Sequence, residues 1–170
     1  ACTGHTMADH WFHLTHLLVD GGKMSKSAGN FYTLTQLSEA GFSPAELRYV
    51  LISAHYRQPL NFVAKDKEGN ETFPALAGAG QALQKIAKFA GALAEQVHPS
   101  QGQVDDLTGF DELKAVKDLG SFAPAFQALL NDLNTSDSLG RVFTAMKSVK
   151  PASLSPKEAK KELFGLMVVM

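Results

Sequence analysis

Residues 16–30 read HLLVDGGKMSKSAGN, and this stretch decides how the rest of the chain is interpreted. The apolar run that ends at Val19 predicts a short strand, and the Asp-Gly-Gly sequence after it predicts a tight turn. A loop then extends over residues 22–30 and carries most of the polar chemistry of this region. We therefore expect one strand, a turn and an exposed loop here.

The loop combines groups that suit the binding of phosphates. Lys23 and Lys26 supply two point charges three residues apart, Ser25 and Ser27 supply hydroxyl groups, and Gly29 permits the backbone to close. Cations at this place would stabilise the negative charge that builds on pyrophosphate when a nucleotide is cleaved. The alternative is that a loop rich in lysine and serine is only solvated.

The chain changes character near residue 65, after which alanine, leucine, lysine and glutamine dominate. Ser43 followed by Pro44 and Glu46 is a typical helix start, and the pattern recurs from Ser155. The predicted helices cover residues 36–40, 44–54, 76–97, 110–133 (restarting near 120–124), 136–149 and 156–170, with a polar linker at 66–70 and a loop at 98–109. Residues 71–170 therefore favour an antiparallel helical bundle.

Composition excludes several classes of protein. The 170 residues include 16 Lys and Arg against 17 Asp and Glu, so the chain is not a polybasic nucleic-acid binder. One cysteine, Cys2, excludes a disulfide scaffold built from this chain alone. The sequence contains neither an apolar run long enough to span a membrane nor a signal-peptide pattern. The lack of an initiator methionine leads us to expect a piece of a longer protein.

Four segments resemble one known family. KMSKS at residues 23–27 is identical to the signature of class I aminoacyl-tRNA synthetases, and WFHLTHLLVDGGKMSKSAGNF at 11–31 closely resembles the cysteinyl-tRNA synthetases. HYRQPLNF at 55–62 resembles a further segment of that family, as does LRY at 47–49. DLNT at 132–135 resembles its DFNT segment, with Leu for Phe and with Ser136 in place of a following proline.

The resemblance implies a C-terminal portion of a cysteine–tRNA ligase. Its partners would be ATP with magnesium, cysteine and tRNA(Cys), it would act in the cytoplasm without a membrane, and the whole enzyme would be a monomer. The implied fold is mostly α: residues 1–30 would be the trailing edge of a nucleotide-binding α/β domain. Residues 31–65 would be a stem-contact region, and 66–170 a helical bundle that contacts tRNA. Alone, the chain would be inactive.

The resemblance also implies roles for single residues. Lys26 would contact the ATP phosphates, and Lys23, Ser25 and Ser27 would shape the loop or touch those phosphates. For His13 and His16, two roles stay open: a place near the nucleotide pocket, or hydrogen bonds that fix the start of the strand.

The residues before the loop raise two further expectations. Trp11 is expected in a core rather than against a ligand. Separated from a parent sheet, the first 20 residues would expose apolar side chains, namely Trp11, Phe12, Leu17 and Val19. We therefore expect this segment to be disordered, displaced or packed on a second copy.

The family's zinc ion is held by residues that would precede this chain. Cys2, His5 and His10 make a poor tetrahedral set, so we expect no metal here. Three alternatives stay open: a cysteine:amino-sugar ligase of mycothiol synthesis, a non-enzymatic RNA-binding helical module, and a class I synthetase for another amino acid. The amino-sugar ligase shares KMSKS and the HYR residues, but PLNF at residues 59–62 and the match at Asn134 and Thr135 favour the cysteine–tRNA ligase. HYRQPLNF argues against a synthetase for another amino acid, whereas only the gene upstream of Ala1 would distinguish the RNA-binding module.

Overall fold

The computed structural model describes residues 8–97 and 118–170. Its small sheet has the order β2-β1-β3, in which β1 (Leu18–Val19) is antiparallel to β2 (Gly22–Lys23) and parallel to β3 (Asn61–Phe62). Asp20 and Gly21 connect β1 to β2 with φ values of 48° and 80°. Positive φ at both positions is the geometry of a tight hairpin, for which Asp-Gly is a favoured sequence. We call β1, β2 and this turn the hairpin.

Two short helices follow the loop after the hairpin. α1 (Leu34–Glu39) begins after Thr33, and α2 (Pro44–Ile52) begins after Ser43; each of these residues forms a capping box with a side chain three residues on. Both helices were predicted. Each places one buried residue, Leu37 in α1 and Val50 in α2, in a core shared with Val19 of β1.

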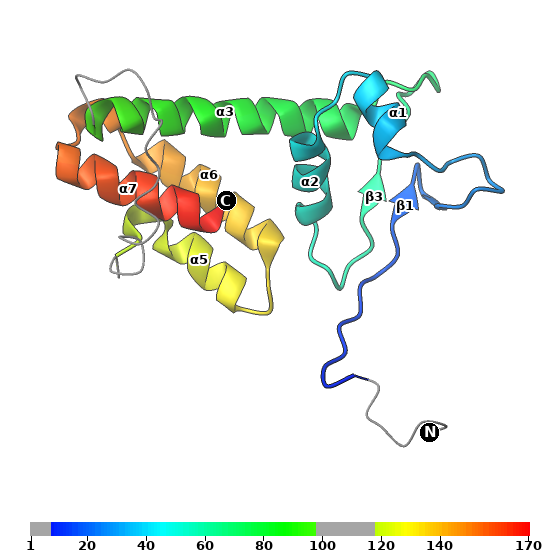
Figure 1. Cartoon of the computed structure of the whole chain (residues 1–170), viewed down its shortest axis with the longest axis horizontal. Helices are drawn as coiled ribbons and strands as arrows, with labels where there is room; N and C mark the ends of the chain where they lie inside the picture. The colour runs from blue at the N-terminus through cyan, green and yellow to red at the C-terminus, as the bar shows by residue number, and fades with distance from the viewer. Residues whose placement is uncertain (1–7, 98–117) are drawn as a thin grey trace.

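The longest helix, α3 (Pro74–Val97), connects the two parts of the molecule (Figure 1). Its first turns bury Leu76 and Ala79 in the core beneath the sheet. Further along, Ile86 belongs to a second core, between α3 and the C-terminal helices. One helix therefore contributes to both cores, which links the sheet region to the bundle.

The bundle contains η1 (Gly120–Phe122), α5 (Ala123–Leu130), α6 (Thr135–Ser148), η2 (Pro151–Ser153) and α7 (Pro156–Val169). α7 runs back along α3, and α5 packs on α6 (Figure 1). Phe122 and Val142 are fully buried at its centre. The structure is mostly helical, as predicted. Among the described residues, no helix has both the length and the apolarity to cross a bilayer.

Several expectations about single segments are wrong. Val19, expected to be exposed, is 2% exposed because its side chain packs in the core with Leu37 and Val50, whereas Trp11, expected in a core, is 66% exposed. β3 was not predicted, since two residues carry no periodic signal. Residues 66–70 form a tight turn, in which Asp66 accepts hydrogen bonds from the amides of residues 68 and 70, rather than a linker.

The helix expected over residues 110–133 restarts at η1 as predicted, but α5 ends at Leu130. Asn134 caps α6 by accepting a hydrogen bond from the Asp137 amide. The predicted loop at 98–109 and the first part of that helix lie outside the described residues, as do Cys2 and His5.

Candidate functional site

The hairpin is held to the strand beside it by side chains as well as by the sheet. An Asp20 carboxylate oxygen accepts hydrogen bonds from the backbone amides of Ala64 at 2.9 Å and Lys65 at 3.2 Å. The Gly21 amide donates to the side-chain oxygen of Asn61 at 2.8 Å. These contacts fix the turn that precedes the lysines against β3 and the residues after it.

The signature loop, residues 23–30, is closed by the side chain of Asn30. Its amide oxygen accepts from the backbone amide of Ser25 at 2.9 Å, and its amide nitrogen donates to the carbonyl of Lys23 at 3.2 Å. The Ser25 hydroxyl accepts from the Ala28 amide at 3.2 Å and lies 3.3 Å from the hydroxyl of Ser27. The loop therefore has a defined conformation.

Met24 anchors the loop to the core, while the two lysines of the loop are exposed. Met24 is half-buried and packs on the core beneath the sheet. Lys23 and Lys26 are exposed, and in the described part of the chain neither forms an ion pair. The Lys26 ammonium lies 5.6 Å from the ring centroid of Phe31, a cation–π distance. Both charges are thus available to an anionic ligand.

His13 and His16 lie in an extended segment before β1, and both are exposed. The ring of His13 stacks on that of Trp11 at 6.3 Å between centroids. Thr15, between the two histidines, donates its amide to the carbonyl of Tyr56 at 3.0 Å. Within residues 8–97 and 118–170, neither histidine makes a hydrogen bond or ring contact with the signature loop. Their proposed roles stay predictions.

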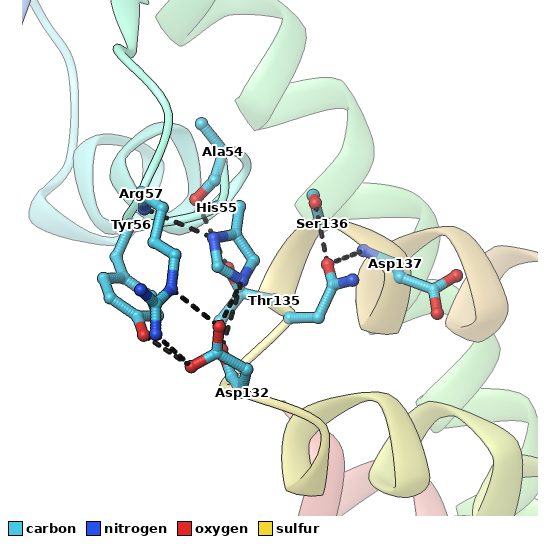
Figure 2. Close-up of polar contacts among 9 residues, drawn as sticks. Ala54, His55, Tyr56, Arg57, Asp132, Thr135, Ser136 and Asp137 are labelled. Atoms are coloured by element: carbon cyan, nitrogen blue, oxygen red, sulfur yellow. Dashed lines mark hydrogen bonds and ion pairs between the residues drawn. The ribbon is translucent and has the colours of Figure 1, made fainter. Parts of the chain in front are cut away.

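A second polar cluster joins two segments that the sequence analysis had singled out separately (Figure 2). Residues 55–57, here called the HYR segment, face Asp132 in the loop between α5 and α6. Arg57 donates from Nε to Oδ2 of Asp132 at 2.8 Å and from Nη2 to Oδ1 at 3.1 Å. The Tyr56 hydroxyl donates to Oδ1 of Asp132 at 2.5 Å. Both carboxylate oxygens are therefore engaged by one short segment.

His55 completes this contact through the backbone. Its Nδ1 accepts from the Arg57 amide at 3.2 Å, so the neutral ring carries its proton on Nε2, which donates to the Asp132 carbonyl at 3.1 Å. The ring stacks on Tyr56 with centroids 4.7 Å apart. Nearby, the Thr135 hydroxyl donates to the Ala54 carbonyl at 3.4 Å. The structure thus brings the HYR segment and the DLNT segment, residues 132–135, into one cluster.

The electrostatics of the cluster favour the ionised carboxylate. The hydrogen bond from Arg57, followed by that from Tyr56, lowers the pKa of Asp132 from 3.8 to about 2. The same hydrogen bond to Asp132 raises the pKa of Tyr56 above its usual 10.0. Tyr56 therefore remains a donor and Asp132 an acceptor over the whole neutral range.

Sequence reasoning missed two functional features. It gave Asn30 no role in closing the loop, although this residue lies in the segment at 11–31 that resembles the family. It also did not foresee that Asp132 would meet Arg57, because nothing in the spacing of segments 75 residues apart reports a contact.

No group of three or more His, Cys, Asp or Glu that could hold a metal ion occurs in the described ranges. Cys2 and His5 lie outside these ranges. The expectation that this chain binds no metal therefore stays a prediction.

A comparison with known protein families identifies the class of protein to which this site belongs. Residues 1–70 match the family model described as "tRNA synthetases class I (C) catalytic domain". The matched range contains the hairpin, the signature loop and the HYR segment. This part of the chain is thus that of a class I tRNA synthetase.

Curated relatives name the family within that class. The Cysteine–tRNA ligase of Opitutus terrae is 38% identical over 149 residues, which are 88% of this chain and 26% of that protein. That of Chlamydia caviae is 40% identical over 136 residues, 79% of this chain and 25% of that protein. That of Brachyspira hyodysenteriae is 33% identical over 150 residues, 88% of this chain and 28% of that protein. The chain belongs to the cysteine–tRNA ligase family and spans about a quarter of the length of these relatives.

Proposed function

We propose that this chain is part of a ligase that activates cysteine with ATP and transfers it to tRNA(Cys). In the first step, the cysteine carboxylate attacks the α-phosphorus of ATP. A carboxyl–phosphate anhydride bond forms, the bond between the α-phosphorus and the bridging oxygen breaks, and pyrophosphate leaves. In the second step, a hydroxyl of the terminal ribose of tRNA attacks the carbonyl, and AMP leaves.

In this scheme Lys26 contacts the phosphates of magnesium-bound ATP, with Lys23 beside it. The observation that carries the proposal is the closed, anchored loop with two exposed lysines that have no ion-pair partner in the described structure. Negative charge moves onto pyrophosphate as the bond breaks, so ammonium groups placed there stabilise the transition state more than the ground state. Ser25 holds the loop, and Ser27, whose hydroxyl lies 3.3 Å from that of Ser25, shapes the loop or touches the phosphates.

The remaining assignments follow the same scheme. We propose that residues 1–30 end a nucleotide-binding domain, that residues 31–65 contact the tRNA stem, and that residues 66–170 are a tRNA-contacting bundle. For His13 and His16 we propose a place at the border of the nucleotide pocket. Because charged tRNA serves translation, we propose that the protein acts in the cytoplasm.

The test is activity of the gene product that contains this chain. We expect cysteine-dependent exchange of labelled pyrophosphate into ATP, no exchange with serine, and attachment of cysteine to tRNA(Cys). Transfer of activated cysteine to an amino sugar instead of tRNA would contradict the proposal in favour of the paralogous ligase. Binding of tRNA with no exchange at all would favour a non-enzymatic RNA-binding module.

A further inference from the structure

Asp132 lies in a connection whose backbone is strained. Its φ is 56°, and that of the next residue, Leu133, is 50°. The left-handed region is tolerated by aspartate, but for leucine it costs about 1–2 kcal/mol. The Leu133 side chain is 54% exposed, so its own burial does not offset this cost. Strain of this kind persists where surrounding contacts determine the conformation.

The connection is held by its own backbone hydrogen bonds, such as that from the Leu133 amide to the Leu129 carbonyl at 3.1 Å, and by side chains of the HYR segment. Three side chains converge on one residue: Arg57 and Tyr56 on the carboxylate, His55 on the carbonyl. The ion pair is solvent-exposed, with side chains 66% and 47% accessible, so its contribution to overall stability is small. Its bidentate geometry instead fixes the direction of the segment relative to the bundle.

The HYR segment continues within three residues into the strand that holds the hairpin. Pro59 restricts the backbone of this short connection. Leu60 and Phe62 accept hydrogen bonds from the amides of Leu18 at 2.8 Å and Asp20 at 3.1 Å. The Asn61 side chain accepts from Gly21 at the turn. A continuous set of contacts therefore runs from the α5–α6 connection to the turn just before Lys23.

We propose that Asp132 is a positioning residue for the signature loop: it fixes the HYR segment to the helical bundle and, through β3, sets the position of the hairpin that ends at Lys23 and leads into the loop with Lys26. The relevance of Asp132 to catalysis rests on the proposed function. The physical connection between Asp132 and the hairpin, here called the mechanical link, does not. A displacement of the bundle, such as one caused by a bound nucleic acid, would then reach the loop through this contact.

The first experiment measures amide hydrogen exchange in this chain, because that readout requires no ligase activity. Asp132→Asn keeps the size of the side chain and removes its charge. We expect the amides of Leu18, Asp20 and Gly21 to exchange about tenfold faster, with global unfolding nearly unchanged. The matched control is Asp137→Asn, which breaks another solvent-exposed Arg–Asp pair, with side chains 49% and 42% accessible, within α6 and away from the HYR segment and the hairpin.

A double-mutant cycle tests whether the effect passes through Arg57. If it does, the amides of the hairpin are protected from exchange in the double variant, Asp132→Ala with Arg57→Ala, no less than in either single variant. Additive effects would overturn the proposed route. Equal protection in Asp132→Asn and Asp137→Asn would overturn the link itself.

The second experiment uses the gene product that contains this chain. Asp132→Asn is expected to raise the KM for ATP in pyrophosphate exchange by about tenfold while the KM for cysteine stays the same, since the loop lysines address the phosphates. Unchanged ATP kinetics would overturn the positioning role. If the unsubstituted protein shows no exchange, the proposed function fails, and the amide protection still decides the mechanical link.

Discussion

The side chain of Asn30 spans the signature loop. One end of its amide group contacts Ser25, and the other contacts Lys23, the residue that begins the loop. The Asn30 side chain accepts the Ser25 amide at 2.9 Å and donates to the Lys23 carbonyl at 3.2 Å. The amide group suits both contacts, because its oxygen accepts and its nitrogen donates. The conformation that presents the lysines thus depends on one residue outside the five-residue signature.

Substitution of Asn30 by Ala is expected to loosen the loop without removing a charge. Two backbone groups lose their partner, so the loop samples other conformations and ATP is held less well. We expect kcat/KM for ATP in pyrophosphate exchange to fall about tenfold, equivalent to about 1.4 kcal/mol. Asn70→Ala is the matched control, since Asn70 makes a similar amide contact to Asp66 in a different turn. Equal losses in both variants would contradict the account.

Two glycines in neighbouring helices are expected to respond in opposite directions to the same substitution. A Cβ at Gly165 in α7 would collide with the carbonyl oxygen of Leu119, whereas a Cβ at Gly140 in α6 would meet nothing within 4 Å. Gly165→Ala is expected to lower the free energy of unfolding by about 1–3 kcal/mol, or more. Gly140→Ala is expected to raise it by about 1 kcal/mol. Urea denaturation of both variants measures this, and stabilisation by Gly165→Ala would show that α7 does not approach Leu119 this closely.

The Asp132 carboxylate is expected to make stability depend on acid. Its pKa is 3.8 when free and about 2 in the folded chain, so the folded state favours the ionised form. The contribution is complete above the free pKa and is lost as pH falls through the folded pKa. The difference in unfolding free energy between the wild type and Asp132→Asn should therefore be constant above about pH 5 and shrink from about pH 4 to about pH 2.

Arg57→Ala provides the check on that dependence, because the Arg57 hydrogen bond is the first cause of the lowered pKa. In this background the pH-dependent difference should be much smaller. A difference that persists unchanged would assign it to a group other than the pair.

The local signals in the sequence predicted much of the fold. Ser43 and Ser155, each followed by proline and then glutamate, begin α2 and α7 with capping boxes as expected. Caps are encoded within four residues, so they can be recognised without knowledge of the rest of the chain. The long apolar face of α3 was recognisable for the same reason: its period lies in the sequence itself.

What could not be predicted depends on contacts between distant residues. β3 has two residues and exists because β1 lies beside it. Trp11 is a large apolar residue of the kind expected in a core, yet it is 66% exposed. The contact of Asp132 with Arg57 joins two segments that were recognised separately, and only the packing of α3 with α2 and the bundle brings them together.

Lys26 is the residue whose exposed ammonium group we expect to act on the phosphates of ATP. The most direct measurement compares Lys26→Ala with Lys67→Ala, an exposed lysine in the turn at residues 66–70, in the gene product that contains this chain. We predict that Lys26→Ala lowers kcat for cysteine-dependent pyrophosphate exchange by about a hundredfold or more, with tRNA affinity retained, while Lys67→Ala has no effect. Exchange at the wild-type rate in Lys26→Ala would contradict the account.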